Sequence, residues 1–180
     1  AAATEIAATT FKRLFRPVPE GSPFPTIEAW GRAFARVRER YGGGCGAFPA
    51  ELFDPADHIY SELSASQDER VLLHGDLHHH NILRSGDGWL AIDPKGLAGE
   101  PAFEIGPFLY NAIEGVDDVR AYTLRRIAQF SEVLGLDRQR LTLWGFALAV
   151  LSTVWMFEDD GTVPERHLVV ARALLGEVQR

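Results

Sequence analysis

Asp76, Asn81 and Asp93 are the residues of this chain whose types and spacing could support chemistry. His74, Asp76 and Asn81 form the pattern H-x-D-x-x-x-x-N, and Asp93 follows farther along the chain. Carboxylate and amide side chains offer oxygen atoms, which are the ligands that hard cations such as Mg²⁺ prefer. The pattern therefore indicates a site for a hard divalent cation.

Two short apolar runs flank these residues and must position them. The run Val71–Leu73 follows a charged stretch and is typical of a short buried strand. The run Trp89–Ile92 predicts a second strand, reached across a turn at Ser85–Gly88, and Pro94 cannot continue a strand ladder. We therefore expect a β-loop-β unit that places the two aspartates and the asparagine near one another.

The same stretch resembles the catalytic loop of protein-kinase-like phosphotransferases, whose pattern is H-R-D-x-x-x-x-N. Gly75 stands in place of the arginine, and Ile92-Asp93-Pro94-Lys95-Gly96 stands in place of D-F-G. The strings HGDLHHHNIL and AIDPKGLAGEPAFEIGPFLYN are similar to the aminoglycoside and hydroxyurea phosphotransferase family, which includes streptomycin kinases. The specific match covers about residues 71–111.

This resemblance implies an ATP-dependent enzyme that moves the γ-phosphate to a hydroxyl of a small molecule, such as an aminoglycoside or hydroxyurea. It implies that Asp76 accepts or orients the proton of the acceptor hydroxyl, while His74 holds the loop by hydrogen bonding. It also implies that Asn81 and Asp93 bind the Mg²⁺ that bridges the ATP phosphates. ATP and Mg²⁺ are thus the expected cofactors.

Outside this unit the chain predicts helices, and we expect one mostly helical α+β domain over residues 1–180. Several helices around one small β unit would resemble the C-terminal lobe of a kinase. A glycine run at 42–46 lacks a preceding strand and a nearby lysine, so it indicates a linker rather than a phosphate loop. The helices are expected at residues 4–15, 26–41, 49–66, from 100 onward, 117–134, 137–156 and 164–179.

The most apolar of these segments, Leu141–Leu151, is bounded by charges and predicts a central buried helix too short to span a membrane. The net charge of −7 argues against a nucleic-acid or anionic-membrane partner and suits a cationic one. The single cysteine, with no segment resembling a signal peptide, favours a cytoplasmic protein.

Acidic residues near the C-terminal helices could form a cleft for a cationic aminoglycoside. The alternative for each one is an ordinary solvated acidic surface. The candidates for substrate contact are Glu104, Glu158 and Asp159. The identity of the acceptor stays open.

The family resemblance also implies an N-terminal lobe with a β-sheet, a glycine-rich loop and a phosphate-contacting lysine. The chain has lysine only at positions 12 and 95, and neither fits that role. We therefore expect that this lobe is absent and that the chain alone does not turn over substrate. We also expect that the exposed inter-lobe surface favours self-association.

Two other functions fit parts of the sequence. His74, His78 and His80 could bind Zn²⁺ or iron in a metal-dependent hydrolase, although adjacent histidines in an extended segment point apart. A kinase-like lobe without its partner could also serve as a non-catalytic binding module. The order Asp76, Asn81, Asp93 favours the phosphotransferase.

Overall fold

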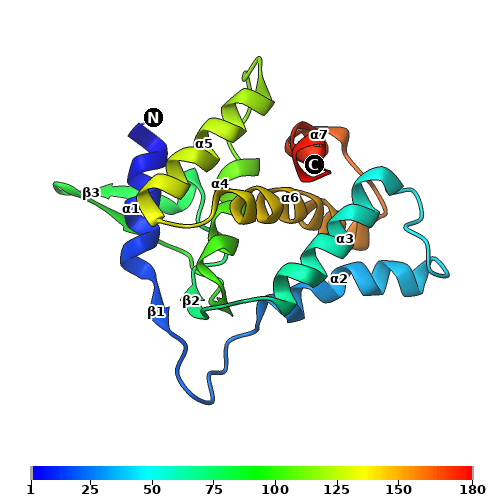
Figure 1. The fold of residues 1–180 in the computed structure, drawn as a ribbon, viewed down its shortest axis with the longest axis horizontal. Helices are drawn as coiled ribbons and strands as arrows, with labels where there is room; N and C mark the ends of the chain where they lie inside the picture. Colours follow the sequence, from blue (N-terminus) through cyan, green and yellow to red (C-terminus); the bar gives the residue numbers. More distant parts are fainter. Residues whose placement is uncertain (1, 180) are drawn as a thin grey trace.

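The computed structural model describes residues 2–179 and shows helices gathered around one long central helix (Figure 1). The long helices lie close to where the apolar periodicity predicted them. They are α1 Ala2–Leu14, α2 Ile27–Arg40, α3 Ala50–Ala65, α5 Val119–Leu134, α6 Arg138–Asp160 and α7 Glu165–Val178. Shorter helical turns are η1 His79–Asn81, η2 Pro101–Ile105 and α4 Gly106–Tyr110.

The central helix is α6, which packs against α2, α3, α4, α5 and α7. Asp137 caps its first turn by accepting a 2.7 Å hydrogen bond from the amide of Arg140, and Gly161 ends it in the left-handed region at φ 74°. With 23 residues it is longer than predicted and, by length and composition alone, long enough to cross a membrane. It is the one such helix among residues 2–179, and 72% of its most apolar stretch is buried in the protein. Its apolar surface is therefore covered by the surrounding helices.

Polar side chains cap the first turns of the flanking helices. The Thr26 hydroxyl accepts from the amide of Ala29 at the start of α2, and Asp118 accepts from Ala121 at the start of α5. Residues 42–46 form turns between α2 and α3, as expected for a linker. The helical assignments therefore follow from local sequence.

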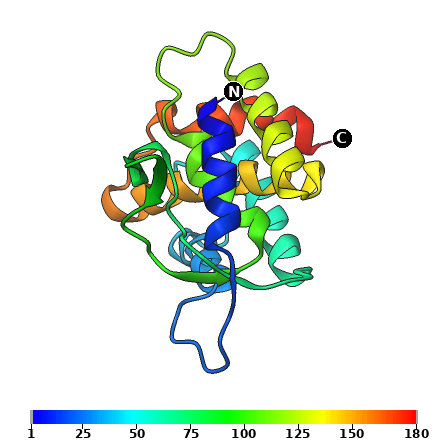
Figure 2. The ribbon, with the colours of Figure 1, turned by 90° about the vertical axis from the view of Figure 1, so that its left-hand side faces the viewer.

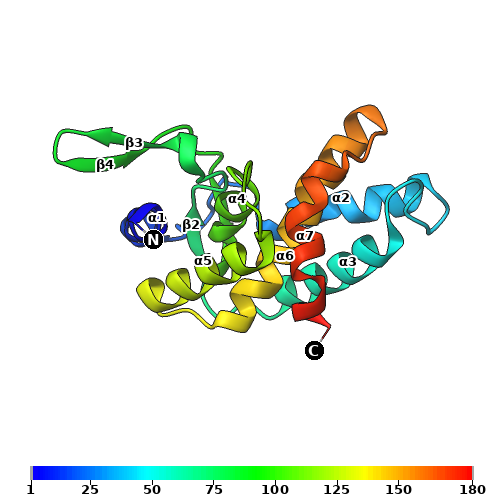
Figure 3. The same ribbon diagram turned by 90° about the horizontal axis from the view of Figure 1, so that it is seen from above.

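The strands form two separate small sheets. β2 (Val71–Leu73) pairs antiparallel with β1 (Arg16–Pro17) and β5 (Leu97–Gly99). β3 (Ile82–Ser85) and β4 (Gly88–Ala91) form a hairpin that projects from the helical body beside α1 (Figure 3). Figure 2 shows α1 running along this side of the molecule, where it packs on α5 and β4.

The predicted β-loop-β unit is present, and the sequence did not indicate the strands β1, β3 and β5. The strand directly after the loop is β3, and the run at 88–91 pairs with it through Ile82 and Ala91. The neighbour of β2 is instead β5, through Leu73 and Leu97. The predicted turn thus closes a two-residue hairpin between β3 and β4, with Gly86 at φ 55°.

Candidate active site

The loop after β2 turns sharply at Gly75, which has a φ of 80°. A Cβ atom at this position would lie 3.3 Å from the ring of Trp30 on α2 and 3.5 Å from the Cβ of Lys95. A larger residue, such as the arginine of the kinase pattern, would therefore strain the backbone, and its side chain would clash with these neighbours. Glycine lets α2 and the segment after Asp93 approach the loop closely.

The Glu104 carboxyl group fixes the main chain of the first two residues of the loop. Its carboxyl oxygens accept hydrogen bonds of 2.7 Å from the His74 amide and 3.1 Å from the Gly75 amide. The side chain is 1% exposed, and this burial raises its pKa to about 8, although the backbone hydrogen bonds lower it. The expectation that Glu104 contributes a surface charge to a substrate cleft is corrected, because the residue lies inside the protein and supports the loop.

His74 joins the loop to the segment that carries Asp93. Its Nε2 lies 2.8 Å from the carbonyl oxygen of Ile92, which can only accept, so Nε2 carries the proton. Its Nδ1 accepts from the amide of Asp76 at 3.3 Å. Burial lowers the pKa of the imidazole, which favours this neutral form. With both ring nitrogens engaged, His74 has the geometry of a positioning residue rather than a proton acceptor.

Asn81 lies at the other end of the loop and is 8% exposed. Its Nδ2 donates to the main-chain carbonyl of Asp76 at 2.8 Å, so the amide atom that a cation could use is Oδ1. Its own carbonyl accepts from the amide of Ile92 at 3.0 Å, which places Asn81 beside the segment of Asp93. The structure thus brings both ends of the loop against one short stretch of chain.

Asp93 ends that stretch in a left-handed conformation, with φ 58°, and its side chain is 67% exposed. The Nζ atom of Lys95 lies 3.1 Å from Asp93 Oδ2 and 3.5 Å from Asp76 Oδ2. The hydrogen bond to Asp93 raises the pKa of Lys95, so the ammonium stays charged. Both aspartate carboxylates therefore contact the same lysine ammonium.

This donor set fits a hard divalent ion. Asp76 and Asp93 offer carboxylate oxygens that both contact the ammonium of Lys95, and Asn81, which is hydrogen-bonded to the main chain of Asp76, offers an amide oxygen. Mg²⁺ is commonly held by one or two carboxylates together with the phosphates of its nucleotide. The chemistry of the residues present is therefore consistent with a Mg²⁺–nucleotide site.

The four histidines of the loop do not form a comparable centre. His74 uses both ring nitrogens on the main chain, while His79 stacks on Phe108 of α4 at 4.0 Å. The rings of His78 and His80 meet edge to face with centroids 5.8 Å apart, and His78 Nδ1 accepts a 3.3 Å hydrogen bond from the His80 amide. The other ring nitrogen of His78, Nε2, lies 3.6 Å from Asp76 Oδ1. Within residues 2–179 no three His, Cys, Asp or Glu side chains are placed to hold a metal. The main-chain contacts of both His74 ring nitrogens argue against its role as a metal ligand in the hydrolase alternative.

His79 instead anchors the loop to α5. Its Nε2 lies 2.9 Å from the guanidinium of Arg126, which also donates to the carbonyl of Phe108 at 3.1 Å and to the hydroxyl of Tyr122. Burial and the nearby guanidinium lower the pKa of His79 to about 4. The imidazole is therefore neutral at physiological pH and accepts from Arg126.

The remaining acidic candidates lie at the C-terminal end of α6. Glu158 accepts two hydrogen bonds from Arg36, at 2.6 and 2.8 Å, so its charge is already paired. Asp159 is exposed. One turn earlier, Trp155 packs edge to face on Trp30 at 5.1 Å, and Trp30 touches the loop at Gly75. This end of α6 is therefore linked to the loop that carries Asp76 through two aromatic side chains.

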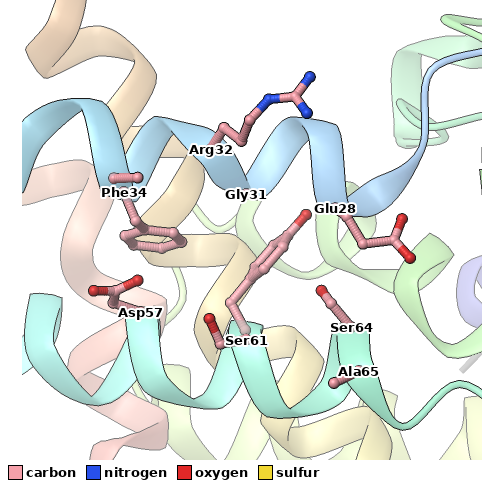
Figure 4. A pocket seen from close by; sticks show the side chains of 10 residues that line it. Glu28, Gly31, Arg32, Phe34, Asp57, Ser61, Ser64 and Ala65 are labelled. Atoms are coloured by element: carbon pink, nitrogen blue, oxygen red, sulfur yellow. The ribbon is translucent and has the colours of Figure 1, made fainter.

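Sequence reasoning missed Glu104, Arg126 and Lys95 as parts of the loop's support. Glu104 and Lys95 lie in the string that resembles the family, but nothing in their residue types distinguishes them, or Arg126, from solvated surface charges. A groove of about 570 Å³ between α2 and α3 contains none of the predicted site residues (Figure 4). Its acids Glu28 and Asp57 pair with Arg70 and Arg38, so the groove has no evident chemical role.

Comparison with known proteins decides the family. Residues 1–161 match the family model described as aminoglycoside/hydroxyurea antibiotic resistance kinase. The chain belongs to this family. The resemblance predicted from the loop residues is thereby confirmed.

Two curated members of the family illustrate the relationship. The chain is 40% identical over 144 residues to a hydroxyurea phosphotransferase of Kitasatospora aureofaciens, covering 79% of this chain and 41% of that protein. It is 39% identical over 136 residues to a streptomycin 6-kinase of Streptomyces griseus, covering 68% and 44%. The chain thus spans about two fifths of the length of these relatives.

Solved structures confirm the kinase-like fold. An aminoglycoside phosphotransferase of Streptomyces rimosus, determined with ADP and streptomycin, aligns with a TM-score of 0.59 at 23% identity, over 84% of this chain and 62% of that one. A choline/ethanolamine kinase family protein of Mesorhizobium loti aligns with a TM-score of 0.61 at 15% identity, over 99% and 60%. The mostly helical α+β fold is therefore that of the aminoglycoside phosphotransferases and choline kinases.

Proposed function

We propose that this chain carries the catalytic loop and metal site of an ATP-dependent phosphotransferase that acts on a hydroxyl of a small molecule. The observation that carries the proposal is the position of the Asp76 and Asp93 carboxylates, which lie 3.5 and 3.1 Å from the same atom, Nζ of Lys95. The family membership supports the same reaction class. The acceptor proposed is an aminoglycoside of the streptomycin type or hydroxyurea, since relatives bear those names.

The roles follow from the geometry. Asp76, 29% exposed and fixed by its main chain to Asn81 and His74, would orient the acceptor hydroxyl and receive its proton. Asn81 and Asp93 would hold Mg²⁺, which supplies a Lewis-acid charge on the phosphate oxygens. Glu104 and His74 keep the loop in place without touching the reactants.

The hairpin offers a place for the nucleotide base. Leu83 and Leu90 are cross-strand partners, and Ile92 follows two residues after Leu90, so the three side chains share one face. They are 45%, 52% and 41% exposed, and Ile92 directly precedes Asp93. An apolar face beside the proposed metal ligand suits the planar base of ATP.

A cationic acceptor suits the charge of the protein. The net charge is −7, and the exposed Asp159 lies at the end of α6 that is linked to the loop through Trp155 and Trp30. Glu158 would contribute only by exchanging Arg36 for a substrate amine. Hydroxyurea carries no positive charge, so the acidic surface favours an aminoglycoside.

The proposal is tested by ATP consumption in the presence of streptomycin, other aminoglycosides and hydroxyurea. The assay uses the protein encoded by the complete reading frame that contains this chain, and the chain by itself in parallel. Acceptor-dependent ADP release with phosphorylated product identifies a kinase. Binding of ADP without turnover of any acceptor would favour the non-catalytic module, and acceptor hydrolysis without ATP would favour a hydrolase.

A further inference from the structure

Lys95 occupies a distinctive position between the two aspartates. Its ammonium lies 3.1 Å from Asp93 Oδ2 and 3.5 Å from Asp76 Oδ2, while its side chain remains 47% exposed. It is one of two lysines in the chain, and the other, Lys12, is exposed on α1. The ammonium thus bridges the proposed acceptor-orienting carboxylate and the proposed metal ligand.

The backbone around Lys95 is held in place for this contact. Its amide donates to the carbonyl of His74 at 2.9 Å, and the amide of Gly96 donates to the same oxygen at 3.2 Å. Gly75 leaves room for the stem, since a Cβ there would lie 3.5 Å from the Cβ of Lys95. The loop that carries Asp76 therefore fixes the base of the lysine, and the flexible end faces both acids.

We propose that Lys95 is a catalytic residue of the phosphotransferase and contacts the transferred phosphoryl group as it passes from ATP to the acceptor. This inference rests on the proposed function. In the reaction the bond between the γ-phosphorus and the β–γ bridging oxygen breaks, and a bond from phosphorus to the acceptor oxygen forms. The acceptor proton passes to Asp76 and then to solvent. The bridging oxygen stays with ADP, the leaving group, and keeps the electron pair of the broken bond. Lys95 exchanges no proton.

The need for such a cation follows from electrostatics. The transferred group must pass between Asp76, which orients the acceptor, and Asp93, which holds the metal, and both carboxylates repel an anionic phosphoryl group. Phosphoryl transfer depends mainly on positioning and charge neutralisation. A half-exposed ammonium beside both acids can turn toward the phosphoryl oxygens with little movement of its stem. As a surface ion pair alone, the same contact would contribute little to folding.

The test compares Lys95→Met, Lys95→Arg and the control Lys12→Met in the protein encoded by the complete reading frame. Two quantities are measured: kcat for acceptor phosphorylation, and the dissociation constants of ADP with and without aluminium fluoride, an anionic mimic of the transferred group. Lys95→Met is expected to lower kcat and weaken the ADP–aluminium fluoride complex by about 10²-fold, as for loss of one preorganised electrostatic partner. Affinity for ADP alone should stay unchanged, and Lys95→Arg should recover part of the loss.

Two results would overturn the inference. An unchanged kcat in Lys95→Met would show that the ammonium does not act on the transferred group. An equal loss of affinity for ADP and for ADP–aluminium fluoride would reduce Lys95 to a support of the local structure. Failure of the unsubstituted protein to consume ATP or bind ADP is a separate outcome, which would refute the proposed function itself and this inference with it.

Discussion

Glu104 accepts a 2.7 Å hydrogen bond from the amide of His74, which starts the loop that carries Asp76, although the two residues lie thirty positions apart in the chain. A carboxyl buried to 1% exposure thus fixes the main chain from which Asp76 projects. Burial raises the pKa of this carboxyl from 4.5 to about 8, so the stability of the fold depends on pH.

The first prediction is that stability contributed by Glu104 falls as pH rises. Between about pH 4.5 and 8 the folded protein keeps this proton while the unfolded chain has lost it, so the free energy of unfolding decreases through this window. Glu104→Gln removes this titratable group. The free energies of unfolding of the variant and the unsubstituted protein are measured in urea at pH 5 and at pH 8, and the variant should gain stability relative to the unsubstituted protein at the higher pH. Glu104→Ala should cost about 1–3 kcal/mol for each amide left without an acceptor.

The exposed Glu114 supplies the control. Glu114→Gln should leave the pH dependence of unfolding as it is. A constant stability difference between Glu104→Gln and the unsubstituted protein across this range would contradict the raised pKa of Glu104.

The second prediction concerns His79 and has the opposite sign. Its pKa is lowered from 6.5 to about 4, so between these values the unfolded chain binds more protons than the folded protein. The stability that His79 contributes is full above about pH 6.5 and is lost as pH falls toward 4. His79→Gln keeps an acceptor for Arg126 without the titration, so its stability relative to the unsubstituted protein should improve on acidification. A stability difference between His79→Gln and the unsubstituted protein that stays constant on acidification would contradict the lowered pKa of His79.

The third prediction separates backbone strain from close packing at Gly75. Gly75 and Gly135 both have left-handed backbones, at φ 80° and 72°, but no atom lies within 4 Å of a Cβ built at Gly135. Replacement by alanine costs about 1–2 kcal/mol for the left-handed backbone at either site. Gly75→Ala should cost more than Gly135→Ala in chemical unfolding and should alter the fluorescence of Trp30. Equal losses would show that the contact with Trp30 and Lys95 is not tight.

The fourth prediction tests Asp93 as the proposed metal ligand. Asp93→Asn keeps a residue that tolerates the left-handed backbone but removes a charged oxygen, so Mn²⁺ binding in the presence of ADP should weaken about tenfold or more, as for loss of a carboxylate in a hard-cation site. The matched control is Asp87→Asn in the exposed hairpin turn. Since the Asp93 side chain is 67% exposed, unfolding stability should change little. Equal Mn²⁺ affinities in the two variants would exclude Asp93 as a ligand.

Much of the helical fold could be predicted from local sequence. Caps such as Thr26 and Asp118, the apolar periodicity and the left-handed stop at Gly135 act within a single helix, and each is visible in a short window. The grouping of Asp76 and Asp93 was also predictable, because both lie within a short stretch around one loop.

The supports of the site could not be predicted in the same way. β5 pairs with β2 across more than twenty residues, and nothing in the three residues Leu97–Gly99 marks them as a strand. Glu104 has the sequence character of a solvated acid until tertiary packing buries it beneath the loop. The contact of Lys95 with both aspartates depends on the positive φ angles of Gly75 and Asp93. Glycine and aspartate tolerate such angles, but the sequence does not indicate which of its many glycines and aspartates adopt them.

The most direct test of the account is the rate of acceptor-dependent ATP turnover by Asp76→Asn in the protein encoded by the complete reading frame. Asn is nearly isosteric with Asp but cannot receive the proton of the acceptor, so turnover should fall by about 10²–10⁴-fold. Unfolding stability and ADP affinity should be retained, and Asp87→Asn should keep full activity. Full activity of the Asp76→Asn protein would contradict the assignment of this loop as the catalytic centre.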